Sequence, residues 1–470
     1  MKYLHVFLHS DMRKALAIII FLGSYAPFSS ADIKYEIEAC CTLCPEINDI
    51  ESYNTRYLKT NIQLVEGADG WLYRSTLDLD EEFELSEDTL VELKRFRKAL
   101  EARGTKLLMV YNPTRGLINS GSVIANSTKN YDFDAAAESY NRALQQIRNT
   151  GIIVPELSTL ISNEGNPSFY FRRDAHWTPN GAMLTAQVVA DKVKTLDFFS
   201  AIPNEKFITK RSGMLNIRGT HQKAAYLICG LEYPYQYVDE FNTEPVEENE
   251  ASLFGESDLP SIVVAGTSFS NGVTNYNFVG YLKEFLSVDV LNVAQSGGGK
   301  IGSLLQYLAS DDFQENPPKL LIWEIPAYTS LDSTFGYREL IPLVNNGCAN
   351  QSNALSRTTK LKNGMNEVLF NGGGEVKLLY GKDYLLDIQF NSPDINRLNA
   401  TIWYHNSRKE RINLKRLSRV NTEGRFVFEL RAKGEWKDFI FTSLDLEVYD
   451  SYPENLEVTA TMCHRNDSNL

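Results

Sequence analysis

The chain has 470 residues, 43% of them hydrophobic and 11% aromatic, and a formal net charge of −13. This length favours two domains, and the apolar content excludes an intrinsically disordered protein. The negative charge argues against binding of anionic polymers through the overall field of the protein, so an acidic partner requires a local basic patch.

The first residues have the pattern of a secretory signal peptide. A basic pair, Arg13-Lys14, precedes an apolar run over 15–22, and small residues follow at 29–31. An uncleaved anchor is the alternative, but this run is shorter than the about 20 apolar residues that span a bilayer. We therefore predict an exported protein. Removal of residues 1–31 takes away Lys2, Asp11, Arg13 and Lys14, a net +2, so the mature charge is −13 − 2 = −15.

Between 88 and 330, predicted helices and strands alternate. Strands that alternate with helices indicate an α/β domain with a mostly parallel sheet covered on both faces. In such folds, ligands bind at the carboxyl ends of the strands. The apolar spacing predicts helices over 88–102, 134–148 and 301–310, a helix starting at Thr178-Pro179, and strands over 106–113, 151–157, 261–266, 288–294 and 319–326.

From about residue 348 the pattern changes to short β-branched or aromatic runs separated by Gly, Asn, Asp or Pro. This pattern is typical of an all-β sandwich. We expect a first domain over 32–345 and a β module over 346–470, and we interpret the acidic segment 239–258 as a surface insertion in the first domain. The runs are 375–390, 400–405, 425–432, 438–449 and 456–464.

An even number of cysteines in an exported chain indicates disulfides. We expect the pairs Cys44–Cys229 and Cys348–Cys463, the second closing the C-terminal domain, with Cys40 and Cys41 as a vicinal pair or as free thiols. The run "CCTLC" is a weak candidate for zinc, because no second Cys/His cluster lies nearby.

Two short motifs carry the residues of a nucleophilic site. In "VVAGTSFSN" (263–271) a buried strand ends at a glycine, and Ser268 follows where the chain turns toward a helix. In "DAHW" (174–177) an aspartate precedes a histidine by two positions. A serine nucleophile needs a histidine base, which needs a carboxylate to fix its tautomer, and Ser268, His176 and Asp174 supply all three. A structural Asp174–His176 pair beside a helix is the alternative. His221, His405 and His464 are weaker candidates without an adjacent carboxylate.

With these motifs, the chain resembles the SGNH-hydrolase-like polysaccharide O-acetyltransferases, in particular the periplasmic alginate O-acetyltransferases. The resemblance extends over nearly the whole mature chain, including the early cysteines and the β module. It departs from ordinary SGNH esterases because the Asp-His pair precedes the serine and because "WEIPAY" (323–328) stands in place of the Gly-x-Asn-Asp block. The oxyanion donors are therefore open; the Ser268 N–H and the "QSGGGK" loop (295–300) are candidates.

Other residues are candidates for binding the sugar. Arg115 ends a strand and is a candidate clamp for a uronate carboxylate, or else a solvated loop residue. Trp323 and Tyr328 are candidates for stacking on a sugar ring, although Trp323 fits a core position better.

The β module contains a basic cluster in which Thr401, Trp403 and Tyr404 are interleaved, as expected of a site for an acidic polysaccharide. A solvated basic face is the alternative, and nucleic acid is a poor fit for an exported protein. The basic residues are Arg397, Arg408, Lys409, Arg411, Lys415, Arg416 and Arg419, opposed in sequence by Glu410.

The resemblance implies a periplasmic enzyme that moves acetyl groups onto mannuronate residues of alginate through an acetyl-serine, without metal, cofactor or soluble acetyl-CoA. It also implies a membrane system that delivers the acetyl group and partners in the alginate secretion complex. An esterase with the same triad and a noncatalytic polysaccharide-binding scaffold are the alternative functions.

Overall fold

The computed structural model describes residues 41–123, 130–161, 166, 168–246, 259–271, 276–332 and 334–465. The predicted signal peptide and the segment 247–258 lie outside these residues. Within the described part of the chain, no helix is both long and apolar enough to cross a membrane.

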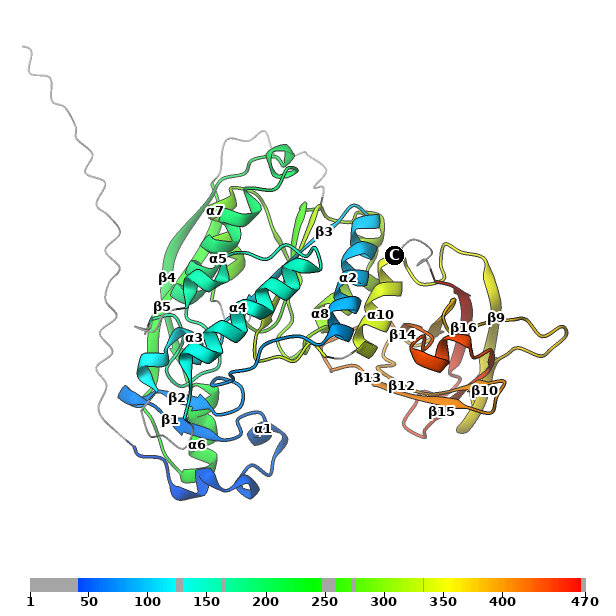
Figure 1. Ribbon diagram of the computed structural model, residues 1–470, viewed down its shortest axis with the longest axis horizontal. Coiled ribbons are helices and arrows are strands. Elements are labelled where there is room, and N and C mark those ends of the chain that lie inside the picture. The colour runs from blue at the N-terminus through cyan, green and yellow to red at the C-terminus, as the bar shows by residue number, and fades with distance from the viewer. Residues whose placement is uncertain are drawn as a thin grey trace, which may run out of the picture. The chain divides into compact units, whose positions relative to one another are not determined.

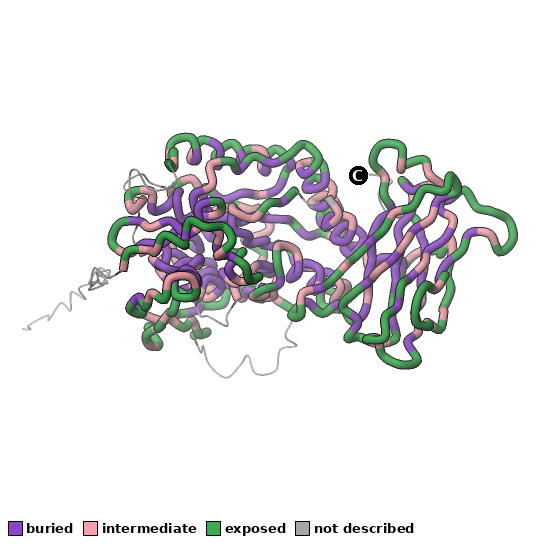
Figure 2. The backbone as a smooth tube through the Cα atoms, turned by 90° about the horizontal axis from the view of Figure 1, so that it is seen from below, coloured by how far each residue is buried: buried purple, intermediate pink, exposed green. Residues whose placement is uncertain are grey.

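A parallel four-stranded sheet forms the centre of the first domain (Figure 1). Its strand order is β3 (Lys106–Asn112), β8 (Leu320–Pro326), β6 (Ile262–Ala265) and β7 (Leu291–Asn292). All residues of β6 and β8 are buried, as expected for a sheet covered on both faces, and Figure 2 shows these buried strands inside the domain. The predicted α/β fold with a parallel sheet is confirmed.

The helices pack in two groups. Helix α5 (Pro179–Val193) packs against α7 (Phe278–Leu286), whereas α10 (Thr334–Val344) packs against α2 (Glu87–Ala102) and α8 (Gly302–Ala309). Figure 1 shows the two groups on opposite sides of the sheet. The remaining helices are α1 (Arg56–Lys59), α3 (Arg115–Ile118), α4 (Phe133–Asn149), α6 (Thr220–Cys229) and α9 (Asp311–Glu315).

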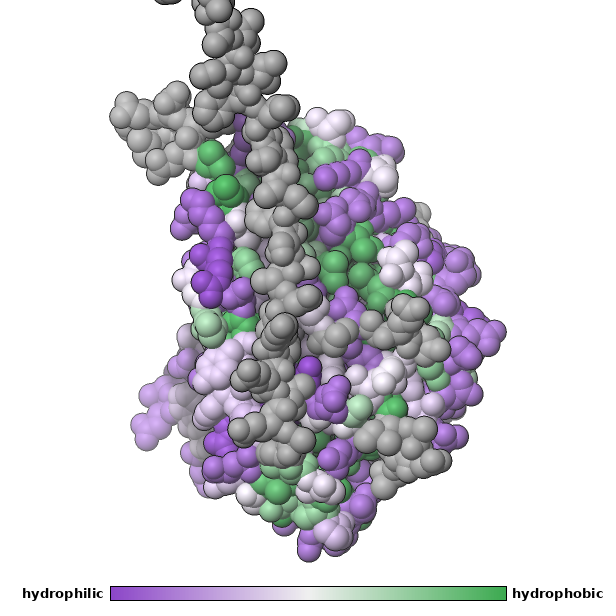
Figure 3. Space-filling view, turned by 90° about the vertical axis from the view of Figure 1, so that its left-hand side faces the viewer, coloured by the Kyte–Doolittle hydropathy of each residue, from purple (hydrophilic) through white to green (hydrophobic). Residues whose placement is uncertain are grey.

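Two antiparallel ribbons complete the first domain: β1 (Leu64–Glu66) with β2 (Leu72–Arg74), and β4 (Phe207–Ile217) with β5 (Gln236–Pro245). The first residues of the predicted acidic insertion belong to β5, and the β4–β5 pair carries exposed Ile208, Met214 and Tyr237. Figure 3 shows hydrophilic residues mixed with small groups of hydrophobic ones on this side of the molecule.

Two strand predictions were wrong in extent. Over 151–157, the described contact with the sheet is a single bridge between Ile153 and Leu108. Pro155, which lacks an N–H, follows closely and cannot donate to a ladder. The run 288–294 forms only the two-residue strand β7.

The β module consists of two four-stranded antiparallel sheets with a shared core, which confirms the predicted sandwich. In β12 the buried residues Leu398, Ala400, Ile402 and Tyr404 alternate with outward-facing ones. The sheet orders are β10 (Gly364–Phe370), β15 (Phe441–Val448), β12 (Arg397–Tyr404), β13 (Lys409–Lys415), and β14 (Arg425–Glu429), β11 (Tyr384–Phe390), β16 (Glu457–His464), β9 (Asn353–Lys360).

Both expected disulfides are present. Cys44–Cys229 links the N-terminal segment to the end of α6, and Cys348–Cys463 links the chain after α10 to β16. Cys41 is also disulfide-bonded, and its partner lies outside the described residues.

Candidate active site

Ser268 lies three residues beyond the end of β6, at the carboxyl edge of the parallel sheet. The turn begins at Gly266, where a Cβ atom would lie 2.7 Å from Oε2 of Glu324. Only glycine therefore allows the chain to pass this close to β8 before it presents the serine.

His176 lies in the loop before α5, and the start of this helix is well defined. The Thr178 hydroxyl accepts hydrogen bonds from the amides of Asn180 and Gly181, and Pro179 occupies the first turn. The loop brings His176 Nε2 to 2.6 Å from Ser268 Oγ, and His176 Nδ1 to 2.6 Å from Asp174 Oδ1. The fold thus brings together the three residues that the two motifs suggested.

The environment of Asp174 favours its charged form. Its Oδ1 also accepts the His176 amide at 2.9 Å, and its Oδ2 accepts the Thr220 amide at 2.7 Å, at the start of α6. Burial opposes ionisation, but His176 and its donors outweigh it and hold the pKa of Asp174 well below its usual range. A permanently charged Asp174 holds Nδ1 of the imidazole in its protonated form, so Nε2 is left to accept the serine proton.

Trp177 connects the histidine loop to the serine turn. Its indole Nε1 donates to the carbonyl of Phe269 at 3.0 Å, and its ring packs against Phe269 and Phe278. Because Trp177 is completely buried, it fixes the separation of the two motifs.

Sequence reasoning did not identify Glu324, which lies in "WEIPAY" (323–328), the run that stands in place of the Gly-x-Asn-Asp block. Its carboxylate accepts the Thr267 backbone N–H at 2.8 Å, the Ser270 hydroxyl at 3.1 Å and the side-chain Nδ2 of Asn112 at 2.8 Å. Burial raises the pKa of Glu324 to about 7, although these donors partly oppose the rise.

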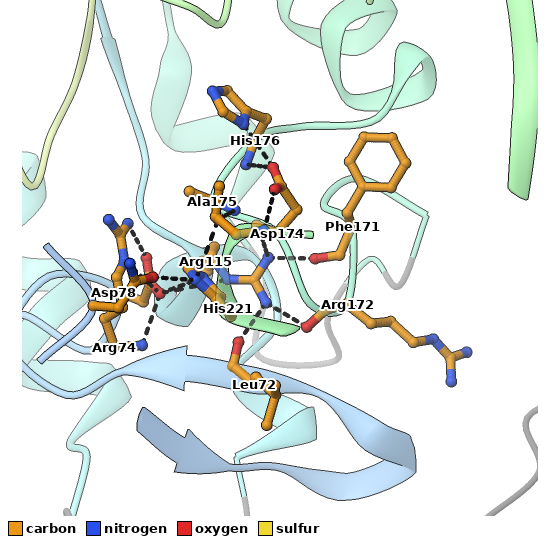
Figure 4. Close-up of polar contacts among 12 residues, drawn as sticks. Leu72, Arg74, Asp78, Arg115, Phe171, Arg172, Asp174, Ala175, His176 and His221 are labelled. Atoms are coloured by element: carbon orange, nitrogen blue, oxygen red, sulfur yellow. Dashed lines mark hydrogen bonds and ion pairs between the residues drawn. The ribbon is translucent and has the colours of Figure 1, made fainter. Parts of the chain in front are cut away.

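Arg115 does not face a substrate. Its side chain is 1% exposed and lies beneath the loop that carries Asp174 and His176 (Figure 4). Its guanidinium donates to the carbonyls of Asp174 at 2.6 Å, Arg172 at 2.9 Å, Leu72 at 2.8 Å and Phe171. With its donors directed at the backbone, Arg115 is not a carboxylate clamp; it supports the loop that carries Asp174 and His176.

A buried charged cluster continues from Arg115. Asp78 forms an ion pair with Arg74 at 2.6 Å and lies 3.1 Å from His221 Nε2 (Figure 4). Burial lowers the pKa of His221 to about 4. His221 is thus a neutral structural residue inside the domain, while His405 and His464 contact Ile440 and Tyr384 in the β module.

The two predicted stacking residues lie on or near β8 in other environments. Trp323 is completely buried, donates to the Lys300 carbonyl at 3.2 Å and packs edge-to-face on Phe96. It is therefore a core residue. The Tyr328 ring is covered by the Arg74 guanidinium, 4.5 Å from the ring centre, so that face is not free for a sugar.

The basic cluster of the β module forms an outward face on β12 and β13. The register pairs Trp403 with Lys409 and Thr401 with Arg411, so that these side chains are neighbours on one face. The Lys409 ammonium lies 5.0 Å from the Trp403 ring centre, and Trp403 Nε1 donates to Asp445 at 2.7 Å. The ring is thereby fixed in orientation beside exposed cations. We define the basic face as Arg397, Thr401, Trp403, Arg408, Lys409, Arg411 and Lys415.

Three residues of the sequence cluster do not belong to this face. Arg419 lies beyond the end of β13 and donates to the Ser296 carbonyl at 3.2 Å. Tyr404 is buried against Trp436 and Phe439, because it follows the inward-facing period of β12. Arg416 is 6% exposed at its side chain and pairs with Glu339 of α10 at 2.6 Å. It therefore belongs to the contact between α10 and the β module.

The "QSGGGK" loop begins beside the serine turn, since the Gln295 amide donates to the Gly266 carbonyl at 3.1 Å. Its position is compatible with an oxyanion donor. Among the residues that the structure describes, no group of three or more His, Cys, Asp or Glu side chains is arranged to hold a metal ion.

Two family models match the chain. Residues 64–327 match the SGNH hydrolase-like domain of acetyltransferase AlgX, and residues 347–470 match a C-terminal carbohydrate-binding module.

Several relatives align over most of the chain. The alginate biosynthesis protein AlgX of Pseudomonas aeruginosa is 40% identical over 91% of this chain and 90% of its own length. AlgX of Azotobacter vinelandii is 37% identical over 92% and 90%. The probable alginate O-acetylase AlgJ of Pseudomonas syringae pv. tomato is 28% identical over 66% and 85%. A solved structure of Pseudomonas aeruginosa AlgX superimposes with a TM-score of 0.83 at 39% identity, covering 90% of this chain and 99% of that chain.

Proposed function

Because the chain belongs to the AlgX family of SGNH hydrolase-like acetyltransferases, we propose that it transfers acetyl groups to hydroxyls of an acidic polysaccharide, the mannuronate residues of alginate. The observation that carries the proposal is the hydrogen-bonded series Asp174–His176–Ser268, with 2.6 Å at each side-chain contact. The names of the relatives, which refer to alginate biosynthesis and alginate O-acetylation, support the substrate.

In the first half-reaction, Ser268 Oγ attacks the carbonyl carbon of an acetyl donor while its proton passes to His176 Nε2. The charged Asp174 stabilises the imidazolium that forms. Collapse of the tetrahedral intermediate breaks the bond to the leaving group, which takes the proton from His176. The product is an acetyl ester on Ser268 and a neutral histidine.

In the second half-reaction, a sugar hydroxyl replaces the leaving group. His176 removes the hydroxyl proton as the oxygen attacks the acetyl-serine, and it returns this proton to Ser268 Oγ when the ester bond breaks. The amide of Ser268 and the loop over 295–300 are the candidate donors for the oxyanion of both intermediates.

The basic face of the β module is the proposed binding surface for the polymer, within a module over 346–470. Uronate carboxylates fit the cations of β12 and β13, and a sugar ring fits the oriented face of Trp403. We place the protein in the periplasm, where a membrane system supplies the acetyl group and proteins of the alginate secretion complex are the partners.

The test is incubation of the protein with a chromogenic acetyl ester, with and without mannuronate oligomers, followed by mass measurement of the oligomers. We expect oligomers that have gained acetyl groups, and Ser268→Ala should abolish both the transfer and the ester turnover. Ser212→Ala, a change of an exposed serine on β4, is the matched control and should leave both unchanged.

The alternative functions give different outcomes in the same experiment. An esterase would release acetate at the same rate with and without oligomers and leave them unmodified. A noncatalytic scaffold would bind the oligomers but show no turnover that depends on Ser268. Transfer by a folded Ser268→Ala protein would contradict the proposed nucleophile.

A further inference from the structure

The Glu324 carboxylate lies at the end of β8, next to the turn that carries Ser268, and its side chain is completely buried. Its Oε2 accepts the Thr267 amide at 2.8 Å, the Thr267 hydroxyl at 3.0 Å and the Ser270 hydroxyl at 3.1 Å. Its Oε1 accepts a hydrogen bond from the side-chain Nδ2 of Asn112 at 2.8 Å. One carboxylate thus connects the ends of three neighbouring elements: β3, β8 and the turn after β6.

These contacts lie on both sides of the nucleophile. Thr267 precedes Ser268 directly, and Ser270 follows it by two residues. The Thr267 hydroxyl, held by Glu324, also accepts the Phe269 amide at 3.3 Å, so the contact extends through the turn. A shift of the carboxylate would therefore move Ser268 relative to His176.

Two tightly held motifs meet at the Ser268–His176 contact. Trp177 fixes the histidine loop, whereas the serine turn depends on Glu324 at its other side. A buried carboxylate is costly unless donors compensate it, so its presence at this position requires a function that an apolar residue would not perform.

We propose that Glu324 is a positioning residue for the nucleophile: in its ionised form it fixes the turn from Thr267 to Ser270 and holds Ser268 Oγ in line with His176 Nε2. This inference rests on the proposed role of Ser268 as the nucleophile.

The donor set matches the ionised form. The Thr267 backbone N–H and the Asn112 side-chain NH2 can only donate, and the hydroxyls of Thr267 and Ser270 also contact the carboxylate. A proton on Glu324 would therefore compete with one of these contacts. Burial raises the pKa of Glu324 to about 7. The titratable groups that act on it are His176, from the histidine loop, and the tyrosines Tyr170 and Tyr328. Burial also raises the pKa of both tyrosines, so they remain neutral between pH 5 and 8.

The experiment measures kcat, KM and the pH profile of acetyl ester turnover for Glu324→Gln in the full chain. The amide has the same size but cannot ionise, and its NH2 group cannot accept the N–H donors. We expect kcat to fall about 10- to 100-fold with KM nearly unchanged, because the turn is misplaced rather than the substrate. The acid limb should also become less steep, because the ionisation of residue 324 no longer contributes to it.

Glu339→Gln is the matched control, since it removes another buried carboxylate in the contact of α10 with Arg416. It should change neither kcat nor the steepness of the acid limb. Ser270→Ala is a milder second variant. Removing one donor should lower kcat about 3- to 10-fold and move the acid limb to higher pH, because the Ser270 hydroxyl lowers the pKa of Glu324.

Equal kcat for Glu324→Gln and the wild type, or an acid limb of unchanged steepness, would overturn the inference. If Glu324→Gln fails to fold, an unshifted acid limb in Ser270→Ala overturns it instead. These results are distinct from a failure of the proposed function, which Ser268→Ala reports independently by retaining turnover.

Discussion

Substitution of Arg115 tests how the loop that carries Asp174 and His176 is supported. Replacing Arg115 with Met keeps the apolar stem but removes the donors to the carbonyls of Leu72, Phe171, Arg172 and Asp174. All four carbonyls lose a charged donor, but the Arg172 carbonyl retains the Leu72 amide at 3.0 Å. At about 1–3 kcal/mol for each of the other three buried acceptors, we expect a loss of free energy of unfolding of about 3–9 kcal/mol. This corresponds to a fall in Tm on the order of 10 °C for a domain of this size.

The assay combines thermal melting with acetyl ester turnover per folded molecule. Arg115→Met should lower kcat about 10- to 100-fold in the folded fraction, because Asp174 and His176 lie on the loop that loses its support. Arg115→Lys should be intermediate, since an ammonium keeps the charge but not the planar set of donors. Arg148→Lys, at a partly exposed pair with Glu156, is the control and should change Tm little. If Arg115→Met melts within about 2 °C of the wild type and keeps its kcat, a supporting role for the guanidinium is refuted.

Three further predictions follow from the same structure. Asp174→Asn should lower kcat per folded molecule on the order of 10⁴-fold, because the amide cannot stabilise the imidazolium, and should also lower Tm, because its NH2 group would face the Thr220 N–H that Oδ2 accepts; a loss of stability with normal activity per folded molecule would indicate a structural pair. For Glu324 the pKa is raised from 4.5 to about 7, so between these values the native state holds a proton that the unfolded state has released. Stability of the wild type relative to Glu324→Gln should therefore fall by about 2.5 kcal/mol as the pH rises from 5 to 8, as urea unfolding at both pH values would measure; parallel pH dependence of the two proteins would contradict this shift. Trp403→Ala, or neutralisation of Arg408 and Lys409, should weaken mannuronate oligomer binding and flatten its salt dependence; unchanged affinity in titrations at two salt concentrations would place the polymer elsewhere.

The sequence pointed to Asp174, His176 and Ser268, which the structure brings within hydrogen-bonding distance, because the relevant signals are local. Thr178-Pro179 defines a helix start whatever the tertiary context, and His176 lies directly before it. Gly266 marks the end of a buried strand, so Ser268 had to lie at the carboxyl edge of the sheet. The two motifs lie close together in space because of the parallel α/β fold, which the alternation of helices and strands also predicted.

The environment of Arg115 could not be read in the same way. Its position after a strand matched a site residue, but its burial depends on β2 and the histidine loop, which come from distant parts of the sequence. In the β module, the sequence pattern was sufficient to predict that Tyr404 is buried. Tyr404 has the same parity as Leu398, Ala400 and Ile402 along β12, and this period of two places its ring in the core.

Arg115 and Glu324 are charged but buried, so a sequence analysis that assigns charged residues to the surface or to a binding site does not identify their role. A cation, Arg115, supports the loop of Asp174 and His176, and an anion, Glu324, supports the turn of Ser268. Each is costly to bury. Backbone carbonyls and the Asp78 carboxylate compensate the guanidinium, whereas one backbone N–H and several side-chain donors compensate the Glu324 carboxylate. Backbone carbonyls surround the guanidinium, and an amide and hydroxyls surround the carboxylate, so the charges fix main-chain positions that an apolar core would leave free to relax. The 2.6 Å contact between His176 and Ser268 joins these two supports, which is why both are expected to affect kcat without touching the substrate.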